Sequence, residues 1–117
     1  MLEEKARELG RLIGQSPEYV AVKTTSEALN RDRDAVTALR RMEELREEAR
    51  RLIERGETPT TAMEAELDSL LGGVQSNITY QRAVSAQENF AKTMLRVNEW
   101  ILDGIKRGSE SRIITLG

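Results

Sequence analysis

The side chains that could perform chemistry in this 117-residue chain are carboxylates, hydroxyls and guanidinium groups, because histidine and cysteine are both absent. Without histidine, the commonest general base and metal ligand at neutral pH is missing. The serine and threonine hydroxyls have no imidazole to activate them as nucleophiles. Without cysteine there is no disulfide and no thiolate to hold zinc or an iron–sulfur cluster. We therefore predict that the protein is not an enzyme and carries no cofactor.

One pair of carboxylates has the spacing of a metal site. Glu64 and Asp68 are four residues apart and therefore share one face of a helix. Helical di-metal centres also need Glu-x-x-His motifs, which this chain cannot supply. The pair falls on the polar face of its helix, and we predict that it is solvated. The dipeptide Gly72-Gly73 is too short for a phosphate-binding loop and is not followed by the lysine of a P-loop.

The arginines are concentrated in the middle of the chain. Residues 31–57 contain eight arginines and eight acids, so this segment has no net charge. A nucleic-acid surface needs a positive field that displaces counterions from phosphates. Glu43 with Arg46, and Glu47 with Arg50 or Arg51, instead have the spacing of ion pairs on a solvated helix. Nucleic acid is not an expected partner.

The first half of the chain predicts three helices. A short amphipathic helix ends at Gly14, and Ser16 has the position of an N-cap for the next, with Pro17 at its first turn. Asp32 is expected to cap a long helix over residues 33–55, and Gly56 is the expected residue after its C-terminus. The apolar positions of this long helix predict its inner face: Val36, Leu39, Met42, Ala49, Leu52 and Ile53.

A loop over residues 57–61 and a shorter helix, weakened by Gly72-Gly73, lead to the most prominent element of the chain. Residues 77–107 contain no proline and only one glycine, and we expect Ser76 or Asn77 to cap this helix. Its apolar seam follows three- and four-residue steps through Tyr80, Ala83, Gln87, Phe90, Met94, Val97 and Ile101. The expected fold is all-α, an antiparallel helical bundle or set of hairpins of about five helices with a long C-terminal helix.

The predicted domain covers residues 1–108, and residues 109–117 form a C-terminal tail that we expect to dock through Ile113 and Ile114. A helix over residues 77–107 is about 46 Å long. A compact domain of this size has a radius of gyration of about 13 Å and a diameter of about 35 Å. The far end of the helix therefore needs a partner, and we predict a homo-oligomer, with a dimer favoured.

The candidate interface residues all lie on this last helix: Tyr80, Gln87, Phe90, Met94, Trp100, Ile101, Leu102 and Ile105. Two of their roles stay open. Gln87, like Asn98, is either a buried amide that fixes register and partner number or a polar residue at the edge of the seam. Trp100 is either an interface anchor or a cap on the hydrophobic core.

The chain resembles the YlbF/YmcA family of small bacterial helical proteins over about residues 4–108. The resemblance rests on two groups of residues. The first is Ala6, Leu9, Ile13, the run Ser16-Pro17-Glu18-Tyr19, Leu29, Asp32 and Leu39; the second is Asn77, Tyr80, Ala86-Gln87, Phe90, Val97 and Ile101. It implies an all-α fold, assembly into dimers or larger complexes, and a non-enzymatic regulatory role. Some members hold iron–sulfur clusters through cysteines, which this chain lacks.

In function, the resemblance implies a regulatory or adaptor protein that acts through helix-mediated protein–protein contacts. The related regulators form a hetero-complex and affect competence, biofilm formation, sporulation and mRNA processing by RNase Y. The arginine bias leaves an alternative of another class, an RNA-associated helical accessory protein. No signal peptide or run of 18 apolar residues is present, so we expect a cytoplasmic protein without membrane association.

Overall fold

A computed structural model of the chain describes residues 1–116, with the side chains of residues 1–110. The described backbone contains five helices and no strand: α1 (Leu2–Gly14), α2 (Pro17–Arg31), α3 (Arg33–Glu54), α4 (Thr61–Gln75) and α5 (Ile78–Leu116). The predictions of an all-α fold, of five helices and of a long last helix are confirmed. At 1.5 Å per residue, the 39 residues of α5 span about 58 Å.

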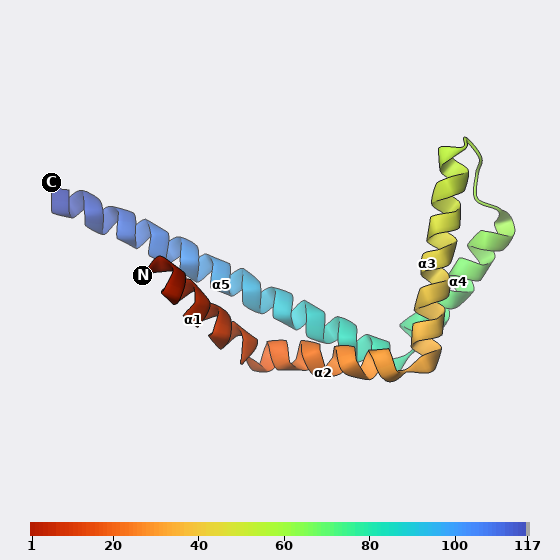
Figure 1. The fold of residues 1–117 in the computed structure, drawn as a ribbon, viewed down its shortest axis with the longest axis horizontal. Helices are drawn as coiled ribbons and strands as arrows, with labels where there is room; N and C mark the ends of the chain where they lie inside the picture. The colour runs from red at the N-terminus through yellow and green to blue at the C-terminus, as the bar shows by residue number, and fades with distance from the viewer. Residues whose placement is uncertain (117) are drawn as a thin grey trace.

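The helices form two arms that meet at one corner (Figure 1). We call α1, α2 and α5 the long arm, in which α2 packs against α5, and the antiparallel pair α3 and α4 the short arm. The molecule measures 70 × 37 × 21 Å, and the radius of gyration of its Cα atoms is 21.9 Å. The compact shape assumed from the chain length, with a radius of gyration near 13 Å, is therefore wrong. The arms diverge from the corner and do not fold against each other.

The predicted helix starts are confirmed. The Ser16 side chain accepts a hydrogen bond from the Tyr19 N–H at 3.2 Å, and Asp32 accepts one from Ala35 at 3.1 Å. Asn77, and not Ser76, caps α5, because its side-chain oxygen accepts from the Tyr80 N–H at 3.0 Å. Each cap satisfies a backbone donor that the helix itself leaves unpaired.

Gly56 ends the helical run of α3 with φ of +78°, as expected for the residue after a helix. The expected end of the last helix is wrong, because α5 continues past Gly108 to Leu116. Helix α4 continues through Gly72 and Gly73, the two residues that were expected to weaken it. A glycine inside a helix costs only about 1 kcal/mol relative to alanine. In α4 the buried Val74 lies beyond both glycines and anchors the last turn. The predicted docking of Ile113 and Ile114 concerns side chains outside the described ones.

Each arm has its own narrow core. The buried apolar residues are Ala35, Met42, Leu45 and Val74 in the short arm, and Ala83, Ala86 and Val97 in the long arm. Most of the predicted inner face of α3 is buried or half-buried, but Ile53 is 62% exposed. It lies beside an open groove at the tip of the short arm. Ala35 and Leu45 are buried and were absent from the predicted face.

The exposed surface reflects this open shape. A compact protein of this mass exposes about 6,400 Å². This chain exposes 9366 Å². Part of the exposed surface is apolar and belongs to large side chains near the end of α5.

Candidate protein-interaction surface

The distal half of α5 presents large apolar side chains that remain exposed among the described residues. Trp100 is 67% exposed, Leu102 64% and Ile105 62%, and Ile101 is exposed as well. In Figure 1 the last turns of α5 run on beyond the N-terminus of α1 with no helix beside them. Of the eight candidate interface residues, these four are brought together as an exposed cluster.

The other candidates lie closer to the corner, where α2 covers one side of α5. Tyr80, Phe90 and Met94 are half-buried. The rings of Phe90 and Tyr19 meet edge to face, with centroids 5.2 Å apart, a geometry that aromatic pairs favour. Phe90 therefore takes part in the packing of α2 against α5. Gln87 and Asn98 are both exposed in the single chain.

Sequence reasoning missed several exposed apolar residues of the long arm. Leu95 is 63% exposed and lies seven residues before Leu102, two helical turns away on the same face. On α1, Leu2 and Leu12 are also exposed. The seven-residue spacing of Leu95 and Leu102 could have indicated this second apolar face, but the two residues lie on the side of α5 away from the main seam. We define the distal patch as Leu95, Trp100, Ile101, Leu102 and Ile105.

The arginines of α3 are tied to neighbouring acids. Arg46 lies 3.8 Å from Glu43, and Arg50 contacts both Glu47 and Glu54. Pairing with Arg50 lowers the pKa of Glu47 below its ordinary value. The predicted pairs of Glu43 and Glu47 are therefore confirmed, and this face of α3 consists of charges of both signs rather than a positive field.

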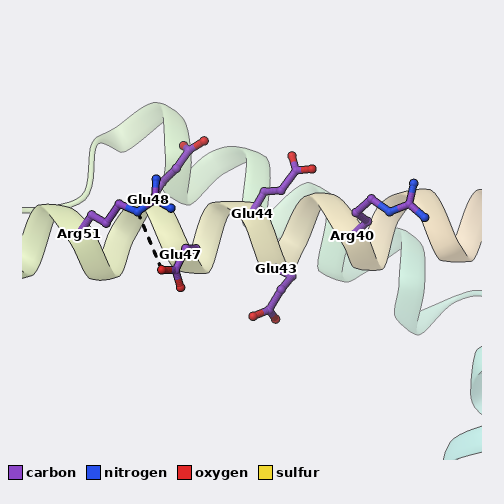
Figure 2. A pocket seen from close by; sticks show the side chains of 6 residues that line it. All are labelled: Arg40, Glu43, Glu44, Glu47, Glu48 and Arg51. Carbon is purple, nitrogen blue, oxygen red and sulfur yellow. Dashed lines mark ion pairs between the residues drawn. The ribbon is translucent and has the colours of Figure 1, made fainter.

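A shallow hollow of about 410 Å³ lies along the same helix. Figure 2 shows its six lining side chains, all from α3: Arg40, Glu43, Glu44, Glu47, Glu48 and Arg51. Four carboxylates face two guanidinium groups there. Such a hollow does not suit a phosphate or another anion, because the negative charges outnumber the positive ones.

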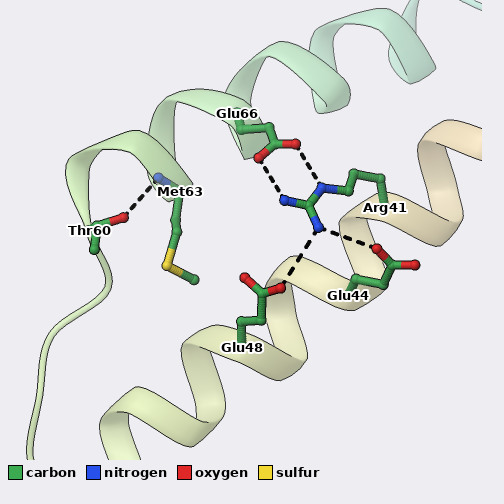
Figure 3. A network of polar contacts seen from close by, with 6 residues as sticks. All are labelled: Arg41, Glu44, Glu48, Thr60, Met63 and Glu66. Atoms are coloured by element: carbon green, nitrogen blue, oxygen red, sulfur yellow. Dashed lines mark hydrogen bonds and ion pairs between the residues drawn. The ribbon is translucent and has the colours of Figure 1, made fainter.

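One arginine crosses between helices and holds the short arm together (Figure 3). The Nε of Arg41 on α3 donates to Glu66 Oε1 on α4 at 2.7 Å, and its terminal nitrogen donates to Oε2 at 3.0 Å. The same guanidinium lies 3.3 Å from Glu44 and 3.8 Å from Glu48. The two-point hydrogen bond lowers the pKa of Glu66 below its ordinary 4.5.

An apolar groove of about 380 Å³ opens at the tip of the short arm. Its apolar lining comes from α3, the connecting loop and α4: Leu45, Ala49, Ile53, Pro59, Met63 and Leu67. Arg46, Arg50, Glu54 and Glu64 form its rim. The groove is a second place where apolar surface meets solvent, far along the short arm from the distal patch.

The structure places no catalytic constellation among the described residues. Glu64 and Asp68 are both exposed, as predicted for a solvated pair. Among the side chains of residues 1–110, no group of three or more acids gathers in the way that a metal ion needs. In the same part of the chain, no helix is long and apolar enough to span a membrane.

The fold and its surfaces define an all-α protein that presents apolar helix faces rather than a reaction site. A family model described as "Control of competence regulator ComK, YlbF/YmcA" matches residues 2–106. The chain belongs to the YlbF/YmcA family, which is a family of regulators and not a known enzyme family. No curated protein matches the sequence.

Proposed function

We propose that this chain is a non-enzymatic regulatory or adaptor protein that acts through helix-mediated protein–protein contacts and forms a homodimer through the distal patch. The observation that carries the proposal is the exposure of five large apolar side chains on adjacent turns of one helix. The family description supplies the regulatory role. Competence, biofilm formation, sporulation and RNase Y-dependent mRNA processing are the processes that the family resemblance implies.

The area of the patch supports pairing with a second copy. Five side chains of this size and exposure leave on the order of 500 Å² of apolar surface bare, near the upper end for a soluble monomer. At 3.6 residues per turn Leu95, Ile101, Leu102 and Ile105 share one side of α5, and Trp100 lies about 100° around the helix from Ile101. Two facing copies therefore bury somewhat less than about 1,000 Å², near the lower bound of a specific interface. In a two-fold dimer the same surface of both chains forms the interface, so that neither chain leaves its patch exposed. Trp100 is the expected anchor of this contact.

A pair of matched substitutions tests the proposal. Ile105 and Ile53 are both helical isoleucines and both 62% exposed, but they lie on different arms. Light scattering of the wild type at tens of micromolar should give twice the 13.2 kDa mass of one chain. Ile105→Glu should reduce the mass to that of one chain, because a charge in the centre of the patch must be desolvated on pairing. Ile53→Glu should leave the dimer mass unchanged.

A wild type that scatters as a single chain contradicts the dimer. If Ile105→Glu and Ile53→Glu change the mass of the particle equally, the interface does not lie at the distal patch. The RNA-associated alternative is tested by binding of total RNA in a filter assay at low and high salt. Affinity that falls steeply with salt indicates phosphate contacts and contradicts a role confined to protein contacts. A hetero-complex with other family members would use the same apolar surface and should be lost in Ile105→Glu.

A further inference from the structure

The chain passes between the two arms at only two points. The first is Asp32, the single residue between α2 and α3, and the second is Ser76–Asn77, between α4 and α5. Both crossings lie at the corner where the arms meet in Figure 1. The angle between the arms therefore depends on what holds these two short connections together.

One hydrogen bond joins them directly. The amide nitrogen Nδ2 of Asn77 donates to Oδ2 of Asp32 at 3.0 Å, across 45 residues of sequence. The remaining polar atom of each side chain is the N-cap already described, Asp32 Oδ1 for α3 and Asn77 Oδ1 for α5. Each side chain thus caps its own helix with one atom and binds the other cap with its second atom.

The Asp32 carboxylate also accepts a hydrogen bond from the side chain of Thr79, the second residue of α5. Among the described side chains, the Asp32–Asn77 pair is the one hydrogen bond that joins side chains of the two crossings. Gln81 on α5 also donates to the backbone carbonyl of Gln75 at 2.7 Å. The residues beside the pair are small, and a hollow of about 160 Å³ lies next to it, lined by Asp34, Ala35, Ala38, Gly73, Val74 and Asn77. The side chains that line this hollow beside the pair are therefore mostly small and interlock less than large ones do.

We infer that the Asp32–Asn77 hydrogen bond is a latch that sets the angle between the two arms, and that the arms move about the corner when it is broken. The latch holds the distal patch on one arm and the apolar groove on the other in one relative orientation. A partner that contacts both surfaces meets a preset geometry while the latch is closed. The inference concerns the single chain and does not depend on the dimer.

The test measures one distance between the arms. The chain has no cysteine, so Ser69→Cys on α4 and Lys92→Cys on α5 create two unique sites for spin labels at exposed positions. Electron–electron distances are recorded with labelled protein diluted in excess unlabelled protein, so that only distances within one chain contribute. The wild-type pair should give one narrow distribution.

Asn77→Asp keeps a capping oxygen for α5, since aspartate caps as well as asparagine, but sets a second carboxylate against Asp32. It should broaden the distribution and add distances outside the wild-type peak. The double variant Asp32→Asn with Asn77→Asp exchanges donor and acceptor, keeps both caps and should restore the narrow peak. A wild-type distribution in Asn77→Asp overturns the latch. A double variant as broad as the single one overturns it too.

Far-ultraviolet circular dichroism checks that each variant remains helical. If Asn77→Asp does not fold, Asn77→Ser replaces it, because serine retains a cap without the amide donor and without added charge. A broadened distribution in Asn77→Ser supports the latch, and a wild-type width overturns it. Light scattering on the same samples separates this result from the dimer, because the latch variants carry no change in the distal patch.

Discussion

Ser16 shows how a single short side chain joins two elements. Its hydroxyl accepts from the Tyr19 N–H at the start of α2 and donates to the Ile13 carbonyl, 2.6 Å away, near the end of α1. Helix α1 contains no buried residue. Its direction relative to α2 is therefore held mainly by this turn rather than by a core.

Replacing Ser16 with alanine should lower the free energy of unfolding by about 1 kcal/mol, because the Tyr19 N–H loses its acceptor. Ser26→Ala is the matched control: Ser26 is an exposed residue in the interior of α2. There alanine should be neutral or slightly stabilising, since its helix propensity exceeds that of serine. Urea unfolding of the three proteins measures both values. Equal losses in the two variants would show that Ser16 is not the cap.

At the scale of elements, α3 and α4 of the short arm are joined by the ion pair between Arg41 and Glu66, whose strength depends on pH. Glu66 is held by Arg41, and its pKa in the folded chain lies below the ordinary 4.5. A carboxylate with a depressed pKa stabilises the fold above its ordinary pKa, and this contribution is lost as the pH falls through the folded value. Glu44 and Glu48 also contact Arg41 and retain part of its pairing.

Glu66→Gln should therefore weaken the acid sensitivity of the fold. From neutral pH to below pH 4.5, the melting temperature of the wild type should fall more than that of the variant. Glu64→Gln is the control, since Glu64 lies on the same helix, is exposed and makes no ion pair among the described residues. Its acid profile should follow the wild type. Parallel profiles for all three proteins would contradict a stabilising bond at Glu66.

Two glycines of opposite backbone conformation give another prediction for helices. A Cβ added at Gly56 or at Gly104 meets no atom within 4 Å, so the backbone decides each outcome. Gly104 lies inside α5, and Gly104→Ala should raise the free energy of unfolding by up to about 1 kcal/mol. Gly56→Ala should lower it, because φ of +78° disfavours a side chain. Thermal unfolding followed by circular dichroism measures both. A destabilising Gly104→Ala would mean that another chain packs against this turn.

Helix starts and polar faces could be predicted from the sequence because they depend on residues within one helical turn of each other. Ser16, Asp32 and the solvated Glu64 belong to this class. The end of the last helix could not, because a single glycine such as Gly108 costs a helix only about 1 kcal/mol and does not by itself stop it. Ile53 was placed on the correct face of α3, but its exposure depends on how far α4 diverges at the tip.

The exposed end of α5 could also be predicted, because a helix of that length outruns its neighbours in any arrangement. Which of the candidate interface residues are exposed could not be predicted: Phe90 and Met94 are half-buried in the long arm, whereas Trp100 and Ile105 stay exposed. That division depends on where α1 and α2 end along α5. The angle between the arms could not be predicted either. Asp32 and Asn77 are 45 residues apart, and the sequence around one does not indicate that it contacts the other.

At the scale of the whole molecule, two narrow cores do not produce a compact particle. The buried residues lie within each arm or at the corner, and no apolar layer joins the far ends. In this structure, therefore, neither arm buries apolar surface of the other beyond the corner. Helix α5, about 58 Å long, supplies most of the long dimension of 70 Å, and its outer half is available for contact.

Small-angle X-ray scattering tests this shape in solution, free of the dimer, when it is applied to Ile105→Glu at a concentration where light scattering gives the mass of one chain. The expected radius of gyration is close to the 21.9 Å of the Cα atoms. A compact chain of this length would instead give about 13 Å. We expect the larger radius because the two arms have separate cores. Closing the arms would also require desolvation of the charged faces of α3 and α5. A radius near the compact value would show that the arms fold together, and the distal patch would then be covered by the chain itself.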